Sequence, residues 1–158
     1  MDMATEAEPQ HIWDADLGYV LRHVESEFPD SAPRNAARLL ELRRFFALLV
    51  GETRPVGMIS PTIDRIWHTF MLFTPQYRTF CEKAFGVFAD HLPRTPDTPV
   101  PDHAVTRFIE RYRARYGEVP DLWFEDLAPE MAVALRRGAV PAGMRWSGWI
   151  PPEKAVRS

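Results

Sequence analysis

Apolar residues recur at three- and four-residue steps over much of the chain, which predicts amphipathic helices rather than strands. The first such stripe ends before Pro29, because proline pushes the preceding residue out of the helical region. A second ends at Gly51 and a third at Gly117, and a last short helix is expected over Pro129–Arg137. In chain order, the three stripes are Trp13, Leu17, Leu21, Val24 and Phe28; Leu39, Leu42, Phe45, Phe46 and Leu49; and Val105, Phe108, Ile109, Tyr112 and Tyr116.

The centre of the chain predicts two helices joined almost without a linker. Pro61 and Pro75 each follow a serine or threonine, and a capping residue before proline is typical of a helix start. Gly86 is suited to end the second helix. The predicted pair therefore runs over Pro61–Phe73 and Pro75–Phe85.

These patterns predict an all-α protein, a single compact domain of about five to six helices, since no strand alternation and no internal repeat stand out. We expect a flexible acidic arm over residues 1–10 and the helical domain over residues 11–138. Residues 139–158 are expected to form an irregular tail that contains tryptophan and proline. The proline-rich run from Leu92 to Pro101 predicts a loop.

Composition excludes several classes of function. The net charge of −3 over 158 residues gives no general attraction to nucleic acid or to an anionic membrane. The arginine row Arg107, Arg111 and Arg115 is expected to be a solvated stripe. No glycine-rich phosphate loop occurs, so neither a nucleotide nor a flavin is expected. With no secretory leader and no apolar run approaching ~20 residues, we expect a cytoplasmic protein.

Four side chains of the central stretch form a candidate metal site. Asp64 and His68 are four residues apart, so they share the border of the apolar stripe on the first central helix. Cys81 lies on the inward stripe of the second helix, and His91 follows in a segment that can fold back over the pair. Together they offer a tetrahedral set of nitrogen, sulfur and oxygen donors, for which zinc is the default metal and iron the next.

Each of these residues also has an ordinary interpretation. A cysteine on an apolar helix face is often a small core residue, which applies to Cys81. Asp64 and His68 can form a hydrogen-bonded pair at the helix edge, and Asp64 can hold the ring nitrogen of His68 that does not bind metal. His91 can be a surface turn residue.

Two further functions stay open on the sequence alone, which does not decide whether the protein is an enzyme. Asp64 and His68 are candidate catalytic residues for a metal-free acid–base enzyme. Alternatively, the chain is a non-enzymatic interaction module that binds a protein partner through Trp146 and Trp149 of the tail, or through the prolines of the loop after His91.

The order of motifs in the central stretch resembles the glycine-rich-domain-containing protein-like family, and in particular its small bacterial members that lack the glycine-rich tail. The resemblance implies that the polar motif positions are those where a site should be sought, and it implies no particular reaction. Members often carry two adjacent histidines where this chain has Asp90 and His91, which implies a site with fewer imidazoles. The matching residues are Asp64, Trp67, His68, Thr74, Tyr77, Phe80, Cys81, Phe85, Gly86, His91 and Pro93, with a looser match at Tyr112, Tyr116, Gly117, Pro120 and Trp123.

Overall fold

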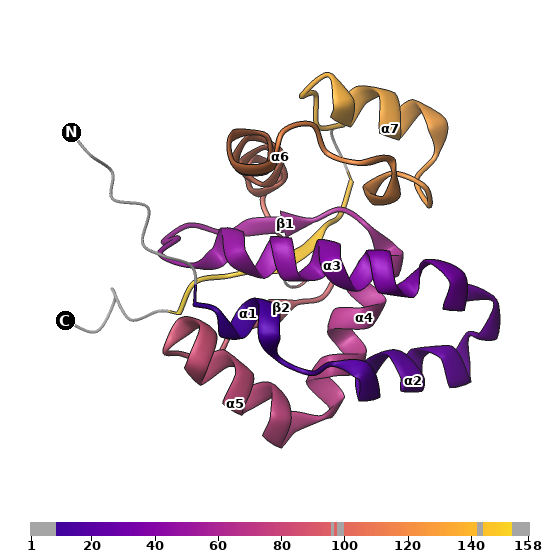
Figure 1. Cartoon of the computed structure of the whole chain (residues 1–158). Helices are drawn as coiled ribbons and strands as arrows, with labels where there is room; N and C mark the ends of the chain where they lie inside the picture. Colours follow the sequence, from indigo (N-terminus) through magenta and orange to yellow (C-terminus); the bar gives the residue numbers. More distant parts are fainter. Residues whose placement is uncertain (1–8, 96, 98–99, 142–143, 153–158) are drawn as a thin grey trace. The chain divides into compact units, whose positions relative to one another are not determined.

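The computed structural model describes residues 9–95, 97, 100–141 and 144–152 (Figure 1). Within these residues the chain is mostly helical and also contains a small three-stranded sheet, so the all-α prediction is correct for most of the fold and wrong for the sheet. Residues 1–8 of the expected acidic arm lie outside the described part. The same holds for Pro96 and Pro99 of the proline-rich loop and for tail residues 142–143 and 153–158.

Seven α-helices are present in the described ranges, and none of them is long and apolar enough to cross a membrane. The helices are α1 (His11–Asp14), α2 (Gly18–Glu27), α3 (Ala32–Leu49), α4 (Pro61–Leu72), α5 (Thr74–Phe85), α6 (Asp102–Tyr116) and α7 (Pro129–Arg136), with 3-10 turns at Pro29–Ser31 and Asp121–Trp123. The strands are β1 (Val56–Met58), β2 (His91–Leu92) and β3 (Ser147–Trp149).

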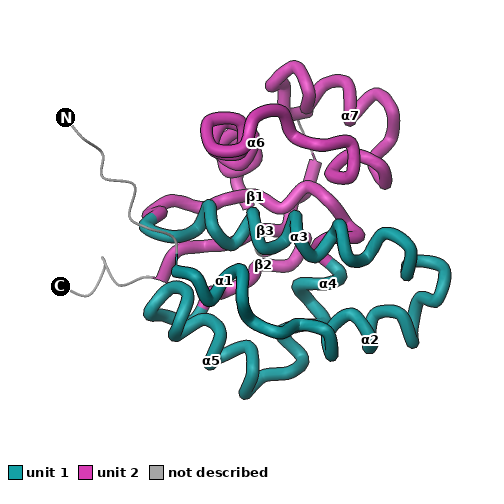
Figure 2. The backbone as a smooth tube through the Cα atoms, in the orientation of Figure 1, with its two compact units in different colours: residues 1–51, 65–88 teal, residues 52–64, 89–158 magenta. Residues whose placement is uncertain are grey.

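The chain forms two compact units, coloured separately in Figure 2. One consists of residues 1–51 and 65–88, and the other of residues 52–64 and 89–158. The division falls inside α4, after its first turn, so this single helix supplies residues to both units.

The central helix pair is confirmed as α4 and α5, and its aromatic side chains pack the core of the first unit. Trp67, Phe70 and Tyr77 are completely buried, together with Phe46 of α3. The indole Nε1 of Trp67 donates to the hydroxyl oxygen of Tyr77 at 3.0 Å, which satisfies the indole N–H inside an aromatic cluster. These residues are therefore structural, as their spacing predicts.

The predicted first helix is interrupted, and the structure has two helices, α1 and α2, in its place. Ala15 adopts an extended conformation that ends α1, and the carboxylate of Asp16 accepts a hydrogen bond from the Gly18 N–H at 2.9 Å where α2 begins. Arg43 donates to the carbonyl oxygens of Ile12 at 2.8 Å and Ala15 at 2.9 Å. This contact from α3 satisfies carbonyls at the break, which an unbroken helix would have used itself.

The sheet of the second unit places β3 between β1 and β2, antiparallel to both. The expectation of an irregular tail is therefore wrong for Ser147–Trp149. A Cβ atom on Gly148 would lie 2.5 Å from the carbonyl oxygen of Val56, so this position requires glycine for the strands to pair. Trp146 and Trp149 are each only 5% exposed.

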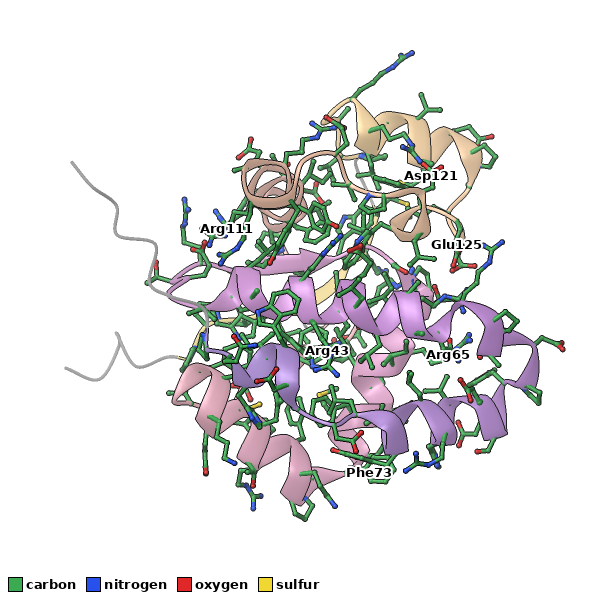
Figure 3. The ribbon with its side chains drawn as sticks, viewed as in Figure 1. Arg43, Arg65, Phe73, Arg111, Asp121 and Glu125 are labelled. Carbon is green, nitrogen blue, oxygen red and sulfur yellow. The ribbon has the colours of Figure 1, made fainter. Side chains whose placement is uncertain are left out.

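Helix α6 packs directly on β1 and holds the segment that precedes this strand. Its Arg107 donates to the carbonyl of Pro55 at 2.6 Å. Arg111, labelled in Figure 3, forms an ion pair with Glu52 at 2.9 Å. Burial alone would raise the pKa of Glu52, but the Arg111 cation and hydrogen bonds from the next two residues outweigh it and lower the pKa. The prediction of a solvated arginine stripe is therefore wrong for Arg107 and Arg111.

Candidate metal centre

The first turn of α4 is fixed by its own capping residues. Ser60 is buried, and its hydroxyl accepts a hydrogen bond from the Ile63 N–H at 3.1 Å, which confirms it as the cap. Thr62 is hydrogen-bonded to Ser60 and donates to the carboxylate of Asp126 at 2.7 Å. Asp64 lies in the same turn, so these capping contacts also hold its backbone in place.

The carboxylate of Asp64 is buried and its two oxygens contact two strands of the sheet. Asp64 is 8% exposed, and its Oδ1 lies 2.8 Å from Nε2 of His91 on β2. Its Oδ2 accepts a hydrogen bond from the hydroxyl of Ser147 on β3 at 3.1 Å. The same hydroxyl lies 3.4 Å from the carbonyl of Met58, so its single proton is shared between two acceptors.

His68 lies one turn after Asp64 on the same helix, and its side chain is exposed. Because α4 is continuous, helix geometry alone sets these two side chains on one face. Asp64, His68 and His91 each offer one ligand atom, and these three atoms lie within 4.8 Å of one another. The structure thus brings together three of the four donors that the sequence suggests.

A bound metal ion would require some adjustment of the three donors. With metal–ligand distances near ~2.0–2.1 Å, neighbouring donors in a tetrahedral site are about 3.3 Å apart. The observed pair Asp64 Oδ1 and His91 Nε2, at 2.8 Å, would open by roughly half an ångström. The imidazole of His68, which is exposed and within 4.8 Å of the other two donors, would move closer to them on binding.

Cys81 is not part of this set of donors. Its side chain is completely buried on α5, in the first unit. Asp90 also lies outside the set, and it is exposed. Among the described residues, the donor group thus contains two imidazoles and one carboxylate, and no thiolate.

The residue that sequence reasoning missed is Ser147. It lies in the segment for which an irregular tail is expected, and no motif marks it. Its role becomes visible only when β3 pairs with its neighbours, because the register that sets Met58 opposite Ser147 also brings the hydroxyl to Asp64. A contact between residues 83 positions apart leaves no local pattern in the sequence.

A comparison with family models matches residues 14–99, which is more than half of the chain. The chain belongs to the UCP032817-like family. The matched region contains Asp64, His68 and His91 but not Ser147, so the three donors lie in the part that the UCP032817-like family describes. The family name assigns no activity. The resemblance to the glycine-rich-domain-containing protein-like family is not addressed by this match and stays a prediction.

No curated protein matches the chain. No solved structure matches it either. For this member of the UCP032817-like family, the geometry of its own side chains is therefore the guide to function.

Proposed function

We propose that this protein binds one divalent transition-metal ion through Asp64, His68 and His91. The observation that carries the proposal is that the three donor atoms lie within 4.8 Å of one another. A carboxylate with two imidazoles suits zinc, with about four ligands in a tetrahedral arrangement, and also iron(II), which two histidines and one carboxylate bind on one face. Zinc is the first assignment and iron the second.

Three protein ligands leave at least one coordination position for water or substrate. Such a position is consistent with the exposure of His68, which lets solvent reach that side of the site. A metal held in this way supplies hydrolytic chemistry if it is zinc and oxidative chemistry if it is iron. The protein would then be a metal-dependent enzyme.

The surrounding residues fit a metal-binding role. Ser147 donates to Oδ2 of Asp64, which fixes the plane of the carboxylate. The Nε2 atom of His91 faces Oδ1 of Asp64. If the metal replaces the proton shared there, then binding releases protons and weakens in acid, where imidazoles are protonated.

Metal content of purified variants tests the proposal. The chain is stripped with chelator, exposed to zinc or to anaerobic iron(II), desalted and analysed for metal. We expect about one ion per chain for the unmodified protein and below ~0.2 for Asp64→Asn, His68→Ala and His91→Ala. The matched control is His103→Ala, which removes an exposed histidine of α6 and should retain the metal.

Cys81→Ala adds a second control, because the thiol lies outside the donor set and the variant should also bind one ion. Less than ~0.2 metal per unmodified chain with either ion would sink the proposal. Full metal content in His68→Ala would show that the three residues do not act together.

A second candidate is a metal-free acid–base enzyme, and one observation favours it. The hydrogen bond between Asp64 and His91 pairs a buried carboxylate with an imidazole, an arrangement that orients a histidine for proton transfer. The two candidates differ in one measurement. Activity on any substrate that is found would survive exhaustive chelation in the acid–base enzyme and would be lost in the metalloenzyme.

A further inference from the structure

A pocket of the second unit adjoins the candidate metal centre at Asp64. The volume that the centre of a water molecule can reach is about 30 Å³. Since one water needs ~10–15 Å³ on this measure, the pocket has room for a group of only a few heavy atoms. Its wall includes Asp64, Ser60 and Ser147, which are the carboxylate of the site, the cap of α4 and the serine that orients the carboxylate.

The rest of the wall combines cations with apolar side chains. Arg94 and Arg145 line the pocket and are exposed, so their guanidinium groups can reach a ligand that enters from solvent. The apolar part of the wall includes three methionines, which adapt readily to the shape of a ligand. The apolar lining residues are Met58, Ile59, Pro61, Leu127, Met131, Met144 and Trp146.

We propose that this pocket binds a small carboxylic acid, with its carboxylate on Arg94 and Arg145 and its short carbon chain against the methionines. The planar guanidinium group matches a carboxylate through two parallel hydrogen bonds. The lining explains why the ligand is an organic acid rather than an inorganic anion, because most of the wall offers apolar contact. The limited volume restricts the carbon chain to two or three atoms.

The pocket and the metal centre share the carboxylate of Asp64, so occupancy of one affects the other. Without metal, the negative charge of Asp64 opposes an anion at this wall. A bound divalent cation reverses the local sign, so the acid binds more tightly to the metal-loaded protein. By reciprocity, the acid increases the affinity for metal by the same factor. This coupling rests on the proposed function, whereas the pocket itself does not.

Methionine methyl NMR tests the proposal on the whole chain. Propionate is titrated into protein labelled at the methionine methyl groups, both metal-free and zinc-loaded. We expect selective shifts of the signals of Met58, Met131 and Met144, while Met71 on α4, which does not line the pocket, stays unchanged. Binding should be at least about fivefold tighter with zinc, within the usual range of coupling.

Substitution of the two arginines completes the test. Arg94→Ala and Arg145→Ala should each weaken propionate binding about tenfold. Arg137→Ala removes an exposed arginine outside the pocket and should leave the affinity for propionate unchanged. Inorganic phosphate is titrated as the alternative anion. If phosphate binds as tightly as propionate, the assignment to a carboxylic acid is overturned.

Two outcomes separate this inference from the proposed function. Absence of selective methionine shifts in a protein that binds one zinc ion would overturn the inference and leave the metal centre intact. Selective shifts in a chain that binds no metal would support the pocket while the proposed function fails.

Discussion

Replacing His91 by alanine separates its role in the metal-free fold from its role in metal binding. Its Nε2 lies 2.8 Å from Oδ1 of Asp64, and the two side chains are only 3% and 11% exposed. A hydrogen bond to a charged group contributes about 1.5–3 kcal/mol, whereas breaking a fully buried ion pair costs about 3–5 kcal/mol. Since Asp64 keeps the donor Ser147 and some exposure, we expect a loss of about 2 kcal/mol.

This loss is large enough to measure. In a chain of this size, 1 kcal/mol lowers the melting temperature by about 2–4 °C, so His91→Ala should melt about 4–8 °C lower in the presence of chelator. His68 is exposed, so His68→Ala should stay within about 0.5 kcal/mol of the unmodified chain under the same conditions. Without metal, His91→Ala should therefore be clearly less stable than His68→Ala.

With metal present, the two variants should become alike. Zinc at 100 times its dissociation constant stabilises the unmodified chain by about 2.7 kcal/mol, and neither variant should show this gain. The assay is urea unfolding followed by circular dichroism, in chelator and in excess zinc, with His103→Ala as the control that behaves like the unmodified chain. Equal stability of His91→Ala and the unmodified chain in chelator would refute the argument about the buried pair. A zinc-dependent gain in His68→Ala would refute its role as a ligand.

Three further predictions follow from single contacts. Ser147→Ala removes the donor to Oδ2 of Asp64, so calorimetry should show zinc affinity reduced about 10- to 100-fold with the stoichiometry unchanged; an unchanged affinity would contradict this. Gly148→Ala places a Cβ 2.5 Å from the carbonyl of Val56, so the sheet must shift, and we expect urea unfolding to show a loss of at least about 2 kcal/mol. Glu52 has a lowered pKa in the folded chain, so its contribution to stability is present above about pH 4.5, the unfolded value, and is lost as the pH falls through the folded pKa. Glu52→Gln should flatten the loss of stability on acidification over that range, and an unaltered pH profile would argue against the linkage.

The helices were largely predictable because each has a local cause in the sequence. The prolines at the starts of α4 and α5 and the glycine after α5 give their bounds to within one residue. The break between α1 and α2 was missed because the apolar spacing continues across it. The contact that stabilises the break comes from Arg43 on a later helix, and such a contact has no trace in the local pattern.

The strands could not be predicted for a different reason. They are two or three residues long, and β1 and β3 are buried at every position, so no alternation of apolar and polar residues exists to be found. Gly57 and Gly148 also lower the strand propensity of these segments, although close packing requires them.

The residues of the candidate site could be predicted where they lie close together in the sequence. Asp64 and His68 follow from helix geometry, and His91 follows from the expected return of the chain after Gly86. Ser147 depends on strand pairing and was not predictable. Cys81 was included because its face points inward, but an inward face on α5 leads to the core of the first unit.

The position of β3 in the sheet has a consequence for biosynthesis. β1 and β2 leave the ribosome first, yet neither pairs with the other, and both must await Ser147–Trp149. A nascent chain stalled near residue 140 would hold all three proposed metal donors but lack the central strand and the hydroxyl that orients Asp64. Under the proposed function, loading with metal should therefore be a late event in maturation, and a chain cut after Gly138 should capture the ion poorly even though all three proposed donors are present.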